Sequence, residues 1–528
     1  MNSFIFSLFL SYSFLLRFLT SAETLDFIIG KLQFPIGNSQ TSFVIKGKTT
    51  YQSLVVIHAV SVPFSVDDDS LNINIEEPNY PSQPISQITS PTFSEEITCP
   101  GCILGTMNIL YICDLAHPNP KEYPDYCVQT NITVPPDEVL SFIVSSNLDS
   151  NSGSFVLDRI KEDTSAVFFM MLGNLYKSPK NSDSKETYLE KYQKFIFDNR
   201  KLSTLLRSKP FVYSFNDLDF AGKDSNANAK GVKAINEAYR ETFPNYIDDD
   251  HNQGEGIYQS FTLNKVKFLM TDSRTFLDKK KEQFFGSKQR DWLKEQFSSA
   301  LESGDNRAII ITVTQPWNYV DDEYDIDIIK QDFVSLTKEM EDDKNVFFEV
   351  LKTYQQENNG SPFNFYYPMK AKIPGKAFKS ILLIVGERHL AFDTGRWNNY
   401  GSFPIAVAGP LDSWQECRGG PYSHGSFHDC KHQYLSVVAK NGCLVLRGII
   451  ANNEDNVGDQ IVFAYNTCMP DAYPGRLDRK CPMVWKEKLI HAFILVFLGI
   501  VVAFVFFFAF YWVGINSFKL KYEKFKTQ

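Results

Sequence analysis

The chain has 528 residues, with 53 Lys and Arg against 62 Asp and Glu, so its formal net charge is -9. This length exceeds that of a small disulfide scaffold and allows roughly two to four domains of about 150 residues. Hydrophobic residues make up 43% and charged residues 22%, which is typical of a folded chain, and the acidic balance argues against nucleic acid as a partner.

The first 22 residues have the features of a secretory signal peptide. An apolar run from Phe4 to Leu19 is followed by small residues up to Ala22, as at a cleavage site. Basic residues are missing before this run, and Arg17 interrupts it, so an uncleaved anchor is the alternative.

Residues 23–136 predict a small β-rich domain. Runs of β-branched and aromatic residues at 43–45, 54–57 and 71–75 alternate with turn residues. The Pro-, Ser- and Thr-rich stretch from Pro78 to Ser94 predicts a long loop. A domain boundary is expected at Pro136.

From Val139 onwards, short apolar runs alternate with helical patterns. Each run is too short for a typical helix and predicts a strand buried on both faces: 139–145, 166–172, 211–215, 266–271, 308–313 and 381–385. One helix is expected to carry Tyr188, Tyr192, Phe195 and Ile196 on a single stripe, and another to begin after Ser287. This alternation predicts an α/β layered domain.

Polar clusters follow the predicted strands. Ligands of α/β domains bind at the carboxyl ends of strands, and carboxylates with an imidazole suit a metal ion that activates phosphate esters. Caps and turns are the simpler interpretation of any one cluster. The clusters are Ser145-Ser146-Asn147, Gly173-Asn174, Asn216-Asp217-Leu218-Asp219, Thr271-Asp272-Ser273-Arg274, Thr314-Gln315-Pro316-Trp317 and Gly386-Glu387-Arg388-His389.

The order of these clusters resembles the alkaline phosphatase D family, the PhoD-like metallophosphoesterases. That family shows Ser-Cys after its first strand, then Gly-Asp, an Asp-Asp-His-Asp box, Asp-x-Arg and Gly-Asp-x-His. The resemblance covers roughly 139–465. It implies a layered metallophosphoesterase-like β-sandwich flanked by helices, preceded by a small all-β domain.

The resemblance also implies a set of site residues. Metal ligands would be Asn174, Asp217, Glu387 and His389, for one divalent or trivalent ion of unknown identity or for none. Phosphate contacts would come from Arg274 and Arg388.

Several family positions are substituted in this chain. Ser146 replaces a metal-binding Cys, Asn174 replaces the carboxylate that bridges two metals, and Asn216 replaces the first Asp of the box. Leu218 replaces the His that would contact the phosphate and protonate the leaving group. Since leucine cannot transfer a proton, and loss of a general acid typically costs ~10²–10⁴-fold in rate, no residue is assigned a catalytic role.

The nine cysteines lie between the predicted signal and the predicted anchor, four in 99–127 and five in 417–481. We expect disulfides within each group and one thiol left over, as in an oxidising compartment. Cys99-Pro-Gly-Cys102 is either a structural disulfide or a redox pair. The Cys- and His-rich stretch 417–432 indicates a disulfide with surface histidines, with structural zinc as the alternative. Asn131 and Asn359 stand in glycosylation sequons.

An uncharged apolar run of 27 residues, Leu489 to Ile515, exceeds the ~20 residues needed to span a bilayer. Tyr511 and Trp512 lie near one end, as interfacial aromatics do. With the signal peptide, this anchor predicts a single-pass type I protein of the plasma membrane or an endomembrane, with an extracellular or lumenal ectodomain.

The predicted organisation is a signal peptide (1–22), a β-rich domain (23–136), a PhoD-like domain (137–465), a juxtamembrane segment (466–488), a transmembrane helix (489–515) and a basic cytoplasmic tail (516–528). Two hypotheses follow. The first is a membrane-anchored, extracytoplasmic phosphoester hydrolase of weakened or lost activity. The second is a non-catalytic pseudoenzyme that binds a phosphorylated small molecule or a surface protein.

Overall fold

The computed structural model describes residues 24–35, 40–63, 84–148, 154–179, 182–252, 254–315, 324–344, 346–349, 353–358, 361–366, 370–386, 389–394, 404–412, 420–424, 426–427, 432–452, 459–469, 471–472, 477–479 and 485–526. The chain divides into two compact units, Met1–Arg479 and Lys480–Gln528.

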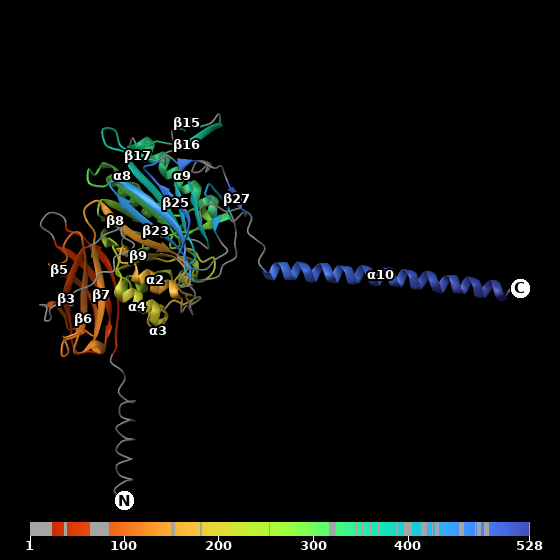
Figure 1. The fold of residues 1–528 in the computed structure, drawn as a ribbon, viewed down its shortest axis with the longest axis horizontal. Coiled ribbons are helices and arrows are strands. Elements are labelled where there is room, and N and C mark those ends of the chain that lie inside the picture. The colour runs from red at the N-terminus through yellow and green to blue at the C-terminus, as the bar shows by residue number, and fades with distance from the viewer. Residues whose placement is uncertain are drawn as a thin grey trace, which may run out of the picture. The chain divides into compact units, whose positions relative to one another are not determined.

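The first unit begins with two antiparallel sheets that share one core (Figure 1). Three strands in the order β1-β2-β5 form one sheet, and four in the order β4-β3-β6-β7 form the other. Their bounds are β1 Leu25–Gln33, β2 Thr41–Thr49, β3 Leu54–Pro63, β4 Pro84–Ile88, β5 Thr92–Cys99, β6 Thr106–Asp114 and β7 Cys127–Val134.

The loop predicted from Pro78 to Ser94 is wrong in its second half, because β4 and the start of β5 lie there. β4 is the edge strand of its sheet. Pro84 opens that strand, where the missing N–H of proline costs no internal ladder bond. The predicted run at 71–75 lies outside the described residues.

A six-stranded sheet follows, in the order β10-β9-β8-β23-β24-β25. β8, β9 and β10 are parallel, and β23 joins β8 in the antiparallel sense. The strands are β8 Val139–Ser145, β9 Phe168–Leu172, β10 Phe211–Ser214, β23 Gln433–Lys440, β24 Cys443–Ile450 and β25 Gln460–Asn466.

A nine-stranded sheet packs against it. Its main path is β11-β12-β13-β18-β20-β19-β22, and β12, β13, β18 and β20 are parallel to one another. Off this path, β17 pairs with β18 and β14 pairs with β17. The strands are β11 Gln259–Leu263, β12 Val266–Met270, β13 Ala308–Val313, β14 Phe347–Glu349, β17 Lys370–Lys372, β18 Lys379–Gly386, β19 Leu390–Asp393, β20 Ile405–Ala408 and β22 Ser426–Phe427.

Helices cover the outer faces of these two sheets. Phe142, Phe168 and Phe268 meet between the sheets, with ring centroids 4.9–5.7 Å apart. Separate apolar clusters join the six-stranded sheet to α2–α6 and the nine-stranded sheet to α8 and α9. The predicted α/β layered fold with a preceding β domain is thus confirmed.

The helices are α2 Phe155–Glu162, α3 Lys185–Asp198, α4 Arg200–Ser208, α5 Asp217–Phe220, α6 Val232–Thr242, α7 Asp249–Asn252, α8 Gly286–Glu302 and α9 Tyr324–Lys344, with short 3₁₀ turns η1 Pro124–Tyr126 and η2 Lys279–Lys281. Two small sheets pair β15 Thr353–Asn358, β16 Ser361–Tyr366 and β26 Asp471–Ala472, and β21 Gly420–Tyr422 with β27 Leu477–Arg479.

Of the two predicted helices, one agrees with its predicted buried face and the other begins earlier than predicted. α3 buries Tyr188, Tyr192 and Ile196, as the predicted stripe requires. α8 begins at Gly286, before the Ser287 expected to cap it. Phe285 is fully buried, and its backbone N–H donates to Asp332 Oδ2 (3.0 Å). This contact with α9 positions the start of α8 without a side-chain cap.

The N-terminal sheets contact the layered part directly. Lys46 Nζ donates to Arg240 O (2.6 Å), and Tyr246 Oη donates to Leu32 O (2.9 Å). The domain boundaries given above stay predictions.

Three pairs of cysteines are joined as disulfides: Cys99–Cys102, Cys113–Cys127 and Cys443–Cys468. Cys417, Cys430 and Cys481 lie outside the described residues, and so does half of the Cys- and His-rich stretch, residues 417–419, 425 and 428–431. Within that stretch, His432 Nδ1 lies 3.0 Å from Ser154 Oγ and 3.1 Å from Asp412 Oδ1.

The second unit contains α10 (Trp485–Lys526). Its segment Phe493–Asn516 is long and apolar enough, by length and composition, to cross a bilayer. This segment overlaps the predicted transmembrane run of 489–515.

Candidate functional site

The carboxyl ends of the parallel strands of both sheets meet at one edge of the layered part. A Cβ atom added to Gly386, the last residue of β18, would lie 2.0 Å from Leu172 O at the end of β9. Thr314 Oγ1, after β13, donates to Phe215 O, after β10 (2.9 Å). The loops that carry the predicted site residues therefore lie side by side.

Asn174 lies in the loop after β9, in a left-handed conformation (φ 56°) that asparagine tolerates. Its Nδ2 donates to Asn147 Oδ1 (2.7 Å), and Asn147 Nδ2 donates to Ser146 Oγ (3.0 Å). Ser146 Oγ donates in turn to Ala408 O (2.8 Å). A relay of neutral groups thus links β9, β8 and β20 where the resemblance implies a thiolate and a bridging carboxylate.

The amide oxygen of Asn174 differs from the rest of this relay. It is buried and has no hydrogen-bond partner among the described residues, and the residue is 9% exposed. An amide oxygen can coordinate a metal ion, so Asn174 has the chemistry that the prediction requires.

Asp217 begins α5 and is turned toward its own backbone. Its Oδ1 accepts from Leu218 N (2.9 Å) and its Oδ2 from Asp224 N (2.9 Å). Both oxygens therefore hold the turn around α5. The carbonyl oxygen of Leu218 accepts a hydrogen bond from Ser178 N (2.8 Å).

Asp219 is fully buried beneath the same turn. It accepts from Leu175 N (2.9 Å), from Asn216 N (2.6 Å) and from the Tyr213 hydroxyl. Burial raises the pKa of Asp219 to about 7, although these donors oppose the shift by favouring the ionised form. This carboxyl fixes the loops after β9 and β10.

Arg274 and Asp272 follow β12. Arg274 Nε and Nη2 donate to Asn216 Oδ1 (2.9 and 2.6 Å), and Nη1 donates to Ser225 O (3.2 Å). Asp272 accepts from three backbone N–H groups, those of Ile257, Arg274 and Thr275. Burial raises the pKa of Asp272, against these bonds. The predicted phosphate-binding Arg274 is 5% exposed and is held by the protein itself.

His389 lies between β18 and β19, and its ring is 1% exposed and packs edge-on against Tyr422 at 5.5 Å between centroids. Glu387 and Arg388, the other two candidates of this loop, lie outside the described residues. So does the sequon residue Asn359, whereas Asn131 is partly exposed on β7.

The donor set fits a dinuclear metal centre poorly. Among the described residues, no group of three His, Cys, Asp or Glu side chains within ligand distance of one another lies at this edge. The group that meets this criterion in the described part of the chain is His58, Cys99 and Cys102, in the N-terminal sheets. Asn174 Oδ1 is a buried oxygen without a hydrogen-bond partner among the described residues, and it could serve one ion. The predicted metal set stays a prediction.

Sequence reasoning missed the roles of Asn147 and Tyr213. Asn147 follows β8 within a cluster that we had singled out, and it also adopts a positive φ (51°). Its position after a strand end was the available signal. Tyr213 read as an ordinary strand residue, and its bond to Asp219 has no signature in the sequence.

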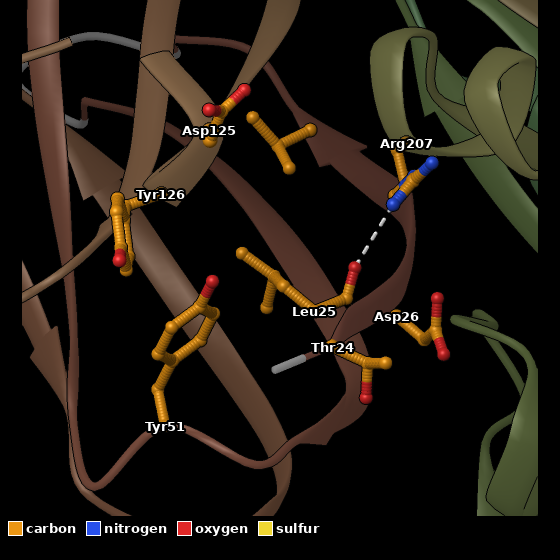
Figure 2. A pocket seen from close by; sticks show the side chains of 8 residues that line it. Thr24, Leu25, Asp26, Tyr51, Asp125, Tyr126 and Arg207 are labelled. Carbon is orange, nitrogen blue, oxygen red and sulfur yellow. Dashed lines mark hydrogen bonds between the residues drawn. The ribbon is translucent and has the colours of Figure 1, made fainter. Parts of the chain in front are cut away.

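A separate surface pocket of about 240 Å³ lies between β1, η1, β7 and α4 (Figure 2). Tyr51 and Tyr126 lie on one side, and Arg207 lies on the other and donates from Nη1 to Leu25 O (3.0 Å). Burial raises the pKa of Asp26, and the charge of Arg207 opposes that rise. None of the predicted site residues lines this pocket.

No protein-family model and no curated protein matches this sequence. Among solved structures, PhoD aligns over 87% of this chain and 92% of its own, with a TM-score of 0.53 and 10% identity. The purple acid phosphatase PPD1 from yellow lupin (Lupinus luteus) seeds aligns over 83% and 73%, with a TM-score of 0.47 and 8% identity. GAP50, the anchor in the inner membrane complex of Plasmodium, aligns over 65% and 90%, with a TM-score of 0.36 and 13% identity.

The likeness to PhoD shows a shared fold. At 10% identity it shows nothing about the reaction.

Proposed function

We propose that this chain is a membrane-anchored protein whose ectodomain keeps the metallophosphoesterase fold as a non-catalytic binding module. One observation carries the proposal: the charged groups Asp217, Asp219, Asp272 and Arg274, which the structure describes at the strand ends, are engaged by the protein's own backbone, a tyrosine hydroxyl and an amide. Both oxygens of Asp217 accept backbone N–H groups, and Arg274 donates to Asn216 and Ser225.

A hydrolase of this superfamily needs charged ligands that face the substrate and a group that protonates the leaving oxygen. Here Asn174 and Asn216 are neutral, and Leu218 has no titratable group. The charges that the structure describes at these strand ends, on Asp217, Asp219, Asp272 and Arg274, stabilise loops. On this view the edge of the sheets is a rigid support for surface loops that bind a protein partner or a phosphorylated ligand.

Residual hydrolysis with a single metal ion is the second candidate, and the unused oxygen of Asn174 favours it. Asn174, Asp217, Glu387 and His389 would hold the ion, which when bound polarises a phosphoryl oxygen. Asn147 would then orient Asn174 through the bond to its Nδ2.

An activity assay separates the two candidates. The full chain, purified in detergent, is given a phosphomonoester and a phosphodiester with Ca²⁺, Mn²⁺, Fe³⁺ or Zn²⁺. A binding module predicts the same background rate for wild type and for Asp217→Ala/His389→Ala, with folding checked by circular dichroism. Metal-dependent turnover that the double variant loses establishes the hydrolase instead.

We further infer a single-pass type I topology in the plasma membrane or an endomembrane, with α10 as the anchor. The expected readout is glycosylation at Asn131, which is partly exposed on β7. Asn131→Gln would then remove one glycan and increase the electrophoretic mobility of the chain. A chain without glycans whose ectodomain is open to protease from the cytoplasmic side contradicts this topology.

A further inference from the structure

We propose that Cys99, Cys102 and His58 form a zinc-binding site when the two cysteines are in the dithiol state. In the part of the chain that the structure describes, this is the group of His, Cys, Asp and Glu side chains whose ligand atoms all lie within 4.8 Å of one another. The site is formed by β3, the end of β5 and the turn after it, none of which carries a residue of the strand-end edge, and it is independent of the function proposed for that edge.

The three ligands come from both N-terminal sheets. Cys99 ends β5 in one sheet, and Cys102 closes the turn that follows, with Cys102 N donating to Cys99 O (3.2 Å). His58 lies on β3 in the other sheet, where the register with β6 shifts between His58 and Val60. A bulge of this kind re-aims a side chain, here toward the turn of the facing sheet.

Gly101 allows the imidazole to lie directly on this turn. A Cβ atom at position 101 would be 2.5 Å from His58 Nδ1 and 2.6 Å from its Cε1. Any other residue would displace the ring. The close approach brings Nδ1, and not Nε2, against the turn that bears both sulfur atoms.

Hydrogen bonds behind the ring select the matching tautomer. Asn108 Nδ2 donates to Ile132 O (3.1 Å), so its Oδ1 faces Ser61 and accepts from Ser61 Oγ (2.7 Å). Ser61 Oγ lies 3.1 Å from His58 Nε2 and can accept its proton. Nδ1 then carries the lone pair that a metal ion requires, and Ser61 and Asn108 orient the ligand as outer partners do in metal sites.

The chemistry of the site matches zinc. Two thiolates and an imidazole are ligands that zinc prefers, and a Cys-x-x-Cys turn is a frequent half of its sites. The Cα atoms of Cys99 and Cys102 are 5.3 Å apart, so rotation of the side chains can place both sulfurs at the Zn–S distance of about 2.3 Å. Three protein ligands leave a fourth position for water.

Burial of the sulfurs favours metal binding over thiol exchange with another protein. Cys99 is 0% and Cys102 2% exposed, whereas a catalytic redox pair needs an accessible thiolate. A small ion can reach sulfurs that a second polypeptide cannot.

Disulfide and zinc compete for the same two sulfur atoms. Reduction of the Cys99–Cys102 bond takes two electrons and two protons, which a small-molecule dithiol supplies as it closes to its own disulfide. Zinc then releases the two thiol protons and binds the thiolates. The disulfide ties the end of β5 to the turn between β5 and β6. Zinc would also bind His58 of β3, so it would hold the two sheets together while the disulfide is open.

The test uses the full chain in detergent, reduced with a phosphine, which leaves no competing thiol in solution. Zinc affinity is measured by competition with a chromophoric chelator, and Co²⁺ is added to look for a thiolate-to-cobalt charge-transfer band. The reduced wild type should bind zinc and show the band, and the oxidised chain should show neither at this site. Cys443→Ser/Cys468→Ser is the matched control and should retain both signals.

His58→Ala and its more conservative counterpart His58→Asn should weaken the affinity for zinc by at least about 10-fold. Gly101→Ala, which keeps all three ligands but displaces the ring, should also weaken it. Cys99→Ser/Cys102→Ser should abolish the charge-transfer band that the matched control retains. Unchanged zinc affinity in the folded Cys99→Ser/Cys102→Ser variant or in both His58 variants overturns the proposal.

Discussion

The guanidinium of Arg274 rests on the amide oxygen of Asn216, which accepts from Nε at 2.9 Å and from Nη2 at 2.6 Å. This contact joins the loop after β12 to the loop after β10, and thus the two sheets of the sandwich. The family that the sequence resembles has a carboxylate at the position of Asn216. In this chain the residue is a neutral amide, and it accepts hydrogen bonds from Arg274.

Asn216→Ala should lower the free energy of unfolding by about 3 kcal/mol, because two N–H groups of a buried cation lose their acceptor. Asn216→Asp is the control, since a carboxylate keeps the acceptor and adds an ion pair. Urea denaturation of both variants checks this. Equal stability of Asn216→Ala and wild type would show that Arg274 finds other partners.

Asn174→Asp should destabilise the chain in the absence of metal. The new carboxylate cannot donate to Asn147 Oδ1, as Asn174 Nδ2 does at 2.7 Å, and two acceptors then face each other. The expected loss is about 1–3 kcal/mol. Added Mn²⁺ or Fe³⁺ should restore the Tm of this variant more than that of wild type, as measured by thermal unfolding. A metal-independent Tm in the variant argues against any cation site next to residue 174.

The stability of the chain should depend on pH through Asp219. Its pKa is raised to about 7 in the folded state, above the ~3.9 of an unfolded carboxyl. The folded state therefore binds the proton more tightly, and this contribution to stability is complete below about pH 4 and disappears as the pH rises to about 7. The urea midpoint of wild type minus that of Asp219→Asn should fall steadily as the pH rises from 4 to 7, because only the wild type loses this contribution. A wild-type midpoint that rises with pH relative to that of Asp219→Asn refutes this assignment.

Gly386→Ala should disrupt the contact between β18 and β9. Its Cβ would lie 2.0 Å from Leu172 O, an atom of the backbone that cannot rotate away. We expect a loss of at least about 2 kcal/mol. Gly304→Ala is the matched control, because nothing lies within 4 Å of its added Cβ. Similar Tm values for the two variants would mean that the strand ends are less closely packed than described.

The sequence predicts the buried strands and the layered fold of this molecule better than the side-chain contacts of its candidate site. Buried strands such as β13 and β18 are continuous apolar runs, and their pattern survives because both faces must be covered. Contact with a neighbouring element overrides local signals elsewhere. Phe285 positions the start of α8 through Asp332, and β4 forms in a Pro- and Ser-rich stretch because β3 offers it a partner.

The site itself depends on orientation, which residue order does not specify. Asp217 stands at a position where the resemblance implies a metal ligand, yet its oxygens accept the N–H groups of Leu218 and Asp224. The relay from Asn174 through Asn147 to Ser146 becomes visible only when β8 and β9 are paired. Substitutions at family positions predict weakened chemistry, and this stays a prediction.

The most direct test of the proposed function is the metal content of the purified, oxidised full chain, measured by elemental analysis after incubation with Ca²⁺, Mn²⁺, Fe³⁺ and Zn²⁺. A non-catalytic module predicts fewer than two bound ions per chain and the same content in Asp217→Ala/His389→Ala. Two ions per wild-type chain that the folded double variant loses would contradict it.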